Sequence, residues 1–393
     1  MNDNFGLFIY SFVQISILLG TLVYTLVYLK RNNIKMRFIY PLLVLYVLLP
    51  VFPMYAMTAT KDVMYTSFVI LFIIEIHKVL TNFKITKKRL AYIILLSILV
   101  CLMRNNGIFV VVPTLLSMVL FIKENKIKIL ISGGFVIGFI IIYSNILLPY
   151  FNISQTSKRE ALSIPFQQTA LYVKKYDEEV TEEEKNAINK ILDYAKINEK
   201  YLPDFSDPVK ETYNKYATRD DLKNYFKVWF NQFLKHPVIY FESILNGTYK
   251  YFYPSEAKGY IYHENLNIMP YKIFANYGYS NFNVKFMDWH YNSLNKLRSC
   301  LIKNANNMQF NLLTAGIVNI AIQNWSLLLM IAYLIKNKKN KYIIMFIPSI
   351  MTLLICIASP VNGYFRYALP IIFSNPFLGI LIMNMNDKNN MNK

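Results

Sequence analysis

Long apolar segments are the feature that most constrains this chain. Runs such as Phe68–Ile76, Ile93–Met103 and Ile108–Ile122 contain few polar residues, and several windows approach the roughly 20 apolar residues that a helix needs to cross a bilayer. Hydrophobic residues make up 55% of the chain and charged residues only 17%. We therefore predict an all-α, polytopic membrane protein and not a soluble globular one.

The apolar pattern predicts about nine transmembrane helices. They are expected at 6–29, 38–55, 63–80, 90–103, 108–122, 129–150, 309–335, 342–358 and 367–385. The polar stretch between the sixth and seventh helices predicts a mostly helical external domain. Within it, Thr181 and Glu184 predict a capping box, and 220–237 predicts an amphipathic helix whose apolar stripe is Leu222, Tyr225, Phe226, Trp229, Phe233 and Leu234. The expected organisation is a six-helix bundle at 1–150, the inserted domain at 151–308, and a three-helix bundle with a cytoplasmic tail at 309–393.

Basic residues assign a side to each loop. Threading nine crossings through the chain places every basic cluster on one face, which the positive-inside rule makes cytoplasmic. The clusters are Lys30–Arg37, Lys84–Arg89, Lys123–Lys128, Lys336–Lys341 and the tail at Lys388 and Lys393. The net charge of +19 is thereby explained by the membrane, without nucleic acid as a partner. The inserted domain, with 21 basic and 18 acidic residues, is expected outside the cell membrane, and so is the N-terminus.

Three basic residues of the membrane part fall on the outer face and break this pattern: Lys61, Arg104 and Arg366. A cation at the external mouth of a helix bundle is retained most easily if it binds an anion. Three external loops that each supply one cation therefore predict an anion site between helices. Asp62, beside Lys61, is the best-placed carboxylate, although helix capping and interfacial anchoring explain the Lys61–Asp62 pair equally well.

The second external loop, "RNNG" at 104–107, is predicted to be a tight return between two helices. Asn106 and Gly107 tolerate turn conformations, so the turn needs no function to explain them. The turn does not explain Arg104, and Asn105 beside it is a candidate ligand contact. In the third loop, "SPVNGYFRYALP" at 359–370, the aromatic residues are equally explained as an interfacial belt.

The stretch "KREALSIPFQQTALYV" at 158–173 adds three polar candidates next to the membrane: Glu160, Gln167 and Gln168. We expect Glu160 as an alternative carboxylate and the two glutamines as substrate contacts. The competing interpretation is a solvated helix that starts near Ser163.

Other chemistries find little support. The sequence has no phosphate-binding glycine loop and no HExxH or CxxC spacing, and its three cysteines and four histidines are scattered. We therefore predict no metal site, no disulfide framework and no firmly implied cofactor, although a divalent metal stays open.

The stretches "TKD", "RNNG", "EALSIPFQQTA", "YLPDFSDPVK", "KHPVIYFESIL" and "FRYALP" together resemble an uncharacterised family of bacterial polytopic membrane proteins. That family is related to the type C glycosyltransferases, which take sugars from polyprenyl-phosphate donors outside the cytoplasmic membrane. The resemblance implies transfer of a sugar to a cell-envelope glycan. It also implies that Arg104 and Arg366 face the lipid phosphate.

The chain departs from type C enzymes at its start. Those enzymes carry a catalytic carboxylate in a first external loop after a first helix, whereas here only Asp3 precedes the first apolar segment. We expect that upstream sequence is missing relative to a longer ancestor, and the alternative is a simple protein with its N-terminus outside. The function expected is thus a glycosyltransferase or a degenerate copy. A transporter or flippase of lipid-linked glycans and a non-catalytic membrane partner stay as alternatives.

Overall fold

The computed structural model describes residues 3–82, 85–122, 125–153, 158–257, 292–308 and 311–390. Within these ranges every regular element is a helix, and the few β-bridges are isolated. The all-helical prediction is therefore confirmed for the described residues. The chain forms two compact units. Unit 1 contains Met1–Ile141, Tyr260–Leu353 and Phe365–Lys393, and unit 2 contains Ile142–Gly259 and Leu354–Tyr364.

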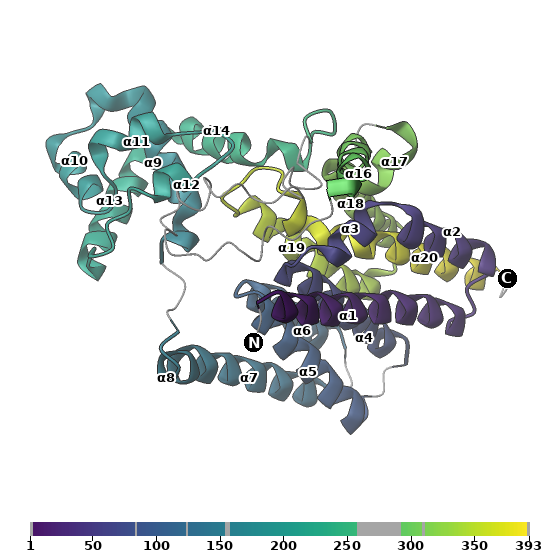
Figure 1. Cartoon of the computed structure of the whole chain (residues 1–393). Coiled ribbons are helices and arrows are strands. Elements are labelled where there is room, and N and C mark those ends of the chain that lie inside the picture. Colours follow the sequence, from purple (N-terminus) through teal and green to yellow (C-terminus); the bar gives the residue numbers. More distant parts are fainter. Residues whose placement is uncertain are drawn as a thin grey trace. The chain divides into compact units, whose positions relative to one another are not determined.

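Unit 1 contains the helices of the long apolar segments and the polar helix α16 (Figure 1). They are α1 (Asp3–Arg31), α2 (Met36–Leu48), α3 (Val51–Met57), α4 (Lys61–Asn82), α5 (Lys87–Met103), α6 (Gly107–Phe121), α7 (Lys126–Ile142), α16 (Asn295–Asn307), α17 (Leu312–Val318), α18 (Ile320–Lys336), η7 (Asn340–Phe346), α19 (Ile347–Ile357), η8 (Phe365–Ala368) and α20 (Leu369–Asn390). The last residues of α7 and of α19 belong to unit 2.

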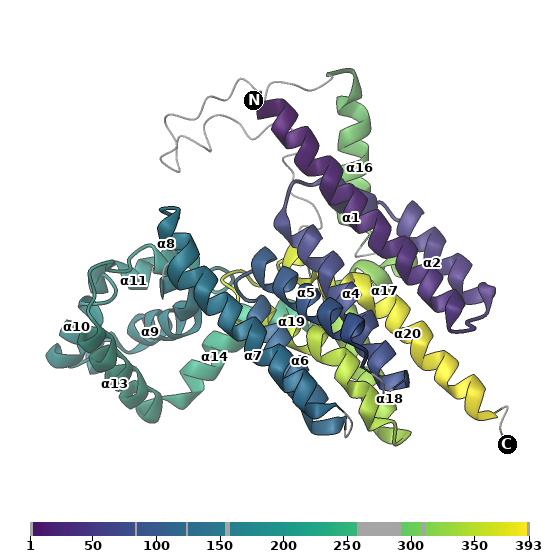
Figure 2. The same ribbon diagram turned by 90° about the horizontal axis from the view of Figure 1, so that it is seen from below.

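Helix α4 is the centre of unit 1. It packs against α1, α5, α20 and η7, and Figures 1 and 2 show it among these helices. It is apolar over its middle and has charged residues near its two ends, and 78% of its most apolar 18-residue stretch is buried, as expected for a helix enclosed by others. By contrast, only 17% of the most apolar 18-residue stretch of the Lys126–Tyr150 segment is buried. Such a helix suits contact with lipid.

The prediction of nine transmembrane helices is wrong. Five helical segments of the described residues are long and apolar enough to cross a membrane, or six if one bent pair counts as a single span. The five are Phe5–Arg31, Lys61–Asn82, Lys126–Tyr150, Asn340–Ile357 and Phe365–Met385. These segments are compatible with a multi-pass membrane protein.

Length and helix breaks account for the difference. Helix α5 has 17 residues and α6 has 15, which at 1.5 Å per residue gives about 22–26 Å against a hydrocarbon core of about 30 Å. The predicted segment 309–335 is divided at Asn319, whose side chain accepts a hydrogen bond from the backbone of Ile322 and so starts α18; residues 309 and 310 lie outside the described ranges. The predicted segment 38–55 is the bent pair, α2 and α3, with 52° between them.

The structure does not describe some of the basic residues from which the cytoplasmic and external sides were predicted. Lys84, Lys123 and Lys393 lie outside the described residues. The placement of the inserted domain outside the membrane, and its boundaries at 151 and 308, therefore stay predictions.

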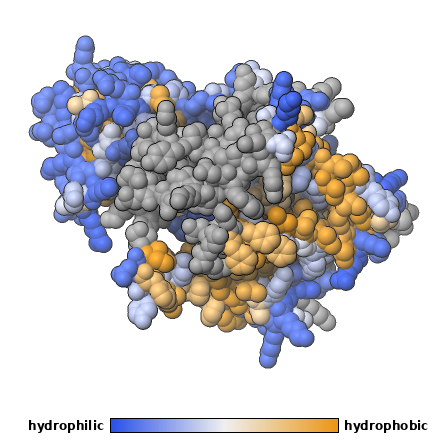
Figure 3. Space-filling model, viewed as in Figure 1, coloured by the Kyte–Doolittle hydropathy of each residue, from blue (hydrophilic) through white to orange (hydrophobic). Residues whose placement is uncertain are grey.

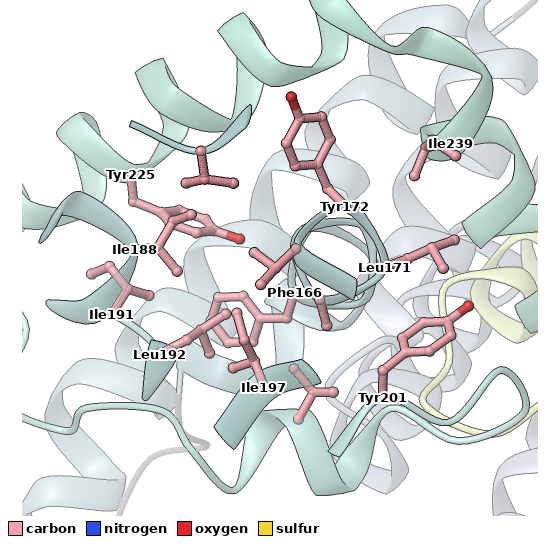
Figure 4. Packing of buried hydrophobic residues seen from close by; sticks show 14 of the residues in the cluster. Phe166, Leu171, Tyr172, Ile188, Ile191, Leu192, Ile197, Tyr201, Tyr225 and Ile239 are labelled. Carbon is pink, nitrogen blue, oxygen red and sulfur yellow. The ribbon is translucent and has the colours of Figure 1, made fainter. Parts of the chain in front are cut away.

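Unit 2 is built around α9 (Figure 4). Its helices are η1 (Tyr143–Leu147), α8 (Leu148–Tyr150), η2 (Lys158–Leu162), α9 (Ser163–Tyr176), η3 (Asp177–Glu179), α10 (Glu182–Asn189), α11 (Tyr194–Lys200), α12 (Asp207–Lys210), α13 (Arg219–Lys235), α14 (Pro237–Thr248) and η4 (Tyr249–Tyr251). Phe166, Ala170 and Tyr172 of α9 are completely buried, and α10, α11, α13 and α14 supply the side chains that enclose them.

The sequence signals in unit 2 correspond closely to its helices. Thr181 and Glu184 form the predicted capping box at the start of α10, with both reciprocal hydrogen bonds present. The predicted amphipathic helix at 220–237 is α13, and Tyr225 from its apolar stripe is fully buried. Leu234 of the same stripe is exposed, so the stripe is narrower than predicted.

The two units differ in surface character. Figure 3 shows hydrophobic colouring gathered on the helices of unit 1, whereas the helices of unit 2 present a mostly hydrophilic face. In unit 1, for example, Ile131 and Phe135 of α7 are more than half exposed. Apolar side chains in such positions are expected where a helix contacts lipid.

Candidate functional site

Asp62, Arg104 and Arg366 meet within unit 1, although they come from three separate elements. Asp62 lies in the first turn of α4, Arg104 ends α5, and Arg366 lies in η8. Asp62 Oδ1 is 3.3 Å from Arg104 Nε, and Asp62 Oδ2 is 3.3 Å from Arg366 Nε. One carboxylate therefore bridges two guanidinium groups, and the cluster carries a net positive charge.

Burial makes this cluster energetically significant. The side chain of Asp62 is 5% exposed, that of Arg104 13% and that of Arg366 38%. An ionised carboxylate is not left in such a position without counter-charges. The Thr60 hydroxyl also donates a hydrogen bond to Asp62 Oδ2 at 3.0 Å. Arg366 is the member most open to a ligand.

The "RNNG" turn holds Arg104 in place by close packing. The backbone N–H of Gly107 donates to the carbonyl of Arg104 at 2.8 Å, which closes the turn. A Cβ on Gly107 would lie 2.4 Å from the carbonyl oxygen of Val100 in α5. Glycine is thus required here because the backbones of α5 and α6 approach each other closely. Backbone conformation is not the reason, since no residue of this turn has a positive φ. Asn105 is exposed in the turn.

Two tyrosines complete the cluster. The guanidinium carbon of Arg104 lies 5.5 Å from the ring centre of Tyr65 and 4.5 Å from that of Tyr367, and Arg366 lies 5.4 Å from Tyr367. These distances suit cation–π contacts. The sequence interpretation placed Tyr367 in an interfacial belt and did not single out Tyr65. Tyr65 could have been found from its spacing, because it lies four residues after Lys61 and therefore one helical turn further along α4.

Lys61 stands apart from this geometry. Lys61 is the first residue of α4, and its side chain is exposed. In the part of the chain that the structure describes, it forms no ion pair with Asp62 or with another acidic residue. Its predicted role as a phosphate contact therefore stays a prediction.

The other predicted residues belong to unit 2 and have protein partners there. Glu160 Oε2 accepts a hydrogen bond from Lys210 Nζ at 2.6 Å, and its Oε1 lies 3.2 Å from Arg159 Nε. Burial raises the pKa of Glu160, but the hydrogen bond and charge of Lys210, with those of Arg159, outweigh it, so the net pKa is lowered. A carboxyl group with a lowered pKa is a weak general base.

The two glutamines are structural in the first instance. Gln167 Nε2 donates to the Leu202 carbonyl at 2.8 Å, and Gln168 Nε2 donates to the Tyr240 carbonyl at 3.2 Å. Gln168 Oε1 accepts from the Trp229 indole at 3.1 Å. Both side chains are buried, contrary to the interpretation of solvated glutamines.

A polar cluster that sequence reasoning missed lies within unit 2, which includes the first part of the third predicted loop. Asn362 Nδ2 donates to Asp204 Oδ1 at 2.9 Å, and Lys250 Nζ donates to Asp204 Oδ2 at 2.6 Å. The backbone N–H of Lys250 donates to Asn362 Oδ1. Gly363 turns the chain with φ of +69°, which favours glycine. A cavity of about 30 Å³ beside this cluster is large enough for a water molecule.

Metal-binding groups are not evident in the described ranges, where no three His, Cys, Asp or Glu side chains converge. Cys101 and Cys356 are buried and Cys300 is exposed, and the three cysteines form no disulfide bond. His263 and His290 lie outside the described residues.

Comparison with known proteins places the chain at the family level. The family described as a family of unknown function (DUF6020) matches residues 2–393. The chain belongs to the DUF6020 family. No curated protein and no solved structure matches it. Membership in DUF6020 carries no activity, so the resemblance to type C glycosyltransferases stays a prediction.

Proposed function

We propose that this DUF6020 protein is a membrane glycosyltransferase, which transfers a sugar from a polyprenyl-phosphate donor to an envelope glycan at the outer face of the membrane. The observation that carries this proposal is the bridge from Asp62 to Arg104 and Arg366. It combines a carboxylate with two guanidinium groups at one place in the bundle.

The chemistry of the transfer matches these groups. As the acceptor oxygen bonds to the anomeric carbon of the sugar, the bond from that carbon to the phosphate oxygen breaks. The acceptor proton needs a base, and the departing lipid phosphate needs cations. Asp62 is the carboxylate available to take the proton, and the two arginines are suited to hold phosphate.

The resting contacts leave room for such a role. Asp62 approaches each guanidinium group at Nε, and a guanidinium group has four further N–H donors on its terminal nitrogens. A guanidinium group can therefore contact a carboxylate through one edge and a phosphate through another. Partial exposure of Arg366 gives a lipid phosphate access to the cluster.

Packing along the middle of α4 offers no polar route for a charged glycan beside this helix. Between the ion pairs near its two ends, Val69, Ile70, Phe72 and Ile73 are completely buried. A transporter of a charged glycan would need polar groups or a water-filled route at this depth. A non-catalytic partner role is separated from both by experiment.

The test uses the full chain in cells that encode it, with the native copy deleted. Arg104→Ala and Arg366→Ala should abolish the incorporation of labelled sugar into envelope glycan. Arg37→Ala is the matched control, because Arg37 is an exposed arginine of α2. Each variant must reach the membrane at the wild-type level and show the wild-type elution volume in detergent.

Asp62→Asn separates two roles of the carboxylate. A base is lost if incorporation stops while binding of polyprenyl phosphate persists, whereas a purely orienting carboxylate would lose binding as well. Unchanged incorporation in all three site variants would refute the proposal and favour a non-catalytic partner.

A further inference from the structure

A large polar cavity lies at the other end of α4, within unit 1. It has a volume of about 570 Å³, which is in the range of small-molecule binding sites. The carboxyl-terminal turns of α1 and α4, the start of α5 and a residue of η7 line it. Three of the lining residues are cations: Arg31, Lys78 and Arg89.

One buried carboxylate organises two of these cations. Glu75 of α4 is 5% exposed and forms an ion pair and a hydrogen bond with Lys78. Arg89 Nε lies 3.9 Å from the other oxygen of Glu75. Among the described residues, one carboxylate and three cations leave two net positive charges at the cavity. Such a surplus of positive charge at the helix ends attracts an anion.

Neutral hydrogen-bonding side chains also line this cavity. They are Tyr24, Asn32, Thr81 and Tyr342. The Lys78 ammonium lies 5.0 Å from the ring centre of Tyr24 and donates a hydrogen bond to its hydroxyl group. Lys78 is thus fixed by an anion, a hydroxyl group and a ring, which makes the site pre-organised.

A second cavity, of about 200 Å³, adjoins the first. Asn32, Thr81 and Tyr342 line both cavities, and Lys339 is added in the second. The space available to a ligand therefore extends from the three cations of the first cavity to Lys339 in the second. A ligand with one strongly anionic group and a further polar part fits this shape.

We propose that this cavity binds a phosphate group, carried either by a lipid headgroup or by a free phosphorylated compound. A phosphate monoester has a charge of about −1.5 to −2 at neutral pH, which matches the two net positive charges. Arginine presents its donors in a planar fork suited to phosphate oxygens. The proposal concerns a site separate from the Asp62 cluster and does not depend on the transferase function.

The competing explanation is that these cations are ordinary positive-inside residues. The immediate neighbours Lys30 and Lys88 fit that explanation: they are exposed, as Arg31 is, but neither lines the cavity. Arg31 and Arg89 do line it. The pair Lys30 and Lys88 is thus a matched control with the same change of charge one residue away.

The experiment measures thermal unfolding of the full chain in nanodiscs. Two probes are used: inorganic pyrophosphate with phosphatidylcholine nanodiscs, and phosphatidic acid mixed into those nanodiscs. Wild type is expected to gain thermal stability with at least one probe. The double variant R31Q/R89Q should lose at least about 10-fold in apparent affinity for that probe, while K30Q/K88Q should keep it.

A further variant guards against a folding defect. Asn82→Asp leaves every cation in place but adds a negative charge to the cavity wall, so it should weaken the same response. A response to pyrophosphate alone assigns a free phosphorylated ligand, and one to phosphatidic acid alone assigns a lipid headgroup. The absence of a response to both probes in the wild type, or an equal loss in the two double variants, overturns the proposal.

Discussion

Replacing Gly107 by alanine tests the geometry of the candidate site most directly. The added Cβ would lie 2.4 Å from the carbonyl oxygen and 2.8 Å from the carbonyl carbon of Val100. Both atoms belong to the backbone of α5, so no side-chain rotation relieves the overlap. Overpacking of this kind costs about 1–3 kcal/mol, and the rigid partner places the change at the upper end of that range.

A helix-propensity gain opposes this cost. Alanine is better than glycine inside a helix by about 0.5–1 kcal/mol, although Gly107 is the first residue of α6 and gains less. We therefore expect Gly107→Ala to lower stability by a net of about 2 kcal/mol. Gly134→Ala is the matched control, because nothing lies within 4 Å of its added Cβ. That variant should be as stable as the wild type or slightly more stable.

The assay is the midpoint of thermal unfolding in detergent, compared among variants at one scan rate. A second readout tests the link to the site. Displacement of the turn moves Arg104 away from Asp62, so Asp62→Asn should cost less in the Gly107→Ala background than alone. Additive effects would refute the link between the turn and Asp62. A Gly107→Ala protein as stable as Gly134→Ala would refute the close approach of α5 and α6.

Four further predictions follow from individual contacts. Asp62→Asn removes the negative charge that contacts both guanidinium groups and should lower stability by about 2–3 kcal/mol in the same thermal assay; an unchanged midpoint would contradict the ion-pair bridge. Thr181→Ala removes the capping box of α10 and should cost about 1 kcal/mol, checked by chemical denaturation. The Glu160 carboxyl has a lowered pKa in the folded state, so its stabilisation is present above its ordinary pKa of 4.5 and is lost as pH falls through the lower folded value; the difference in thermal unfolding midpoint between wild type and Glu160→Gln should therefore shrink on acidification, and a difference that does not change with pH would contradict a contribution of the ionised carboxyl group to stability. Cys300 alone among the three cysteines is exposed, so an impermeant maleimide should label it in intact cells if residues 151–308 are external, whereas labelling only after permeabilisation would place them inside.

The meeting of Asp62, Arg104 and Arg366 was accessible to sequence reasoning for a simple reason. Each residue sits next to a helix end, and the sidedness of helix ends can be inferred from the positions of the other charges. Charge counting therefore indicated one face for the three residues. It could not give their separations, because these depend on how α4, α5 and η8 pack against one another.

The number of spanning helices was overestimated because apolar composition does not measure helix length. The residues of α6 are almost all apolar, yet its 15 residues are too few for a typical bilayer. Asn319 shows a second limit, since one capping side chain divides an apolar segment that reads as continuous. The link between Asn362 and Asp204 joins residues 158 positions apart, and no local pattern encodes such a contact.

Helix α4 explains how one buried element supports two charged clusters. Asp62 and Glu75 are 13 positions apart, which corresponds to about 20 Å along the axis, and the completely buried side chains between them, such as Ile70 and Phe72, hold the helix rigidly. Each carboxylate is therefore fixed by α4, whereas its cations come partly from neighbouring elements: Arg104 and Arg366 at one end, Arg89 at the other. Any shift of these neighbours along α4 changes the ion pairs at that end first. Ligands that compete for the cations are thus expected to act on the packing of the neighbours and to leave α4 in place.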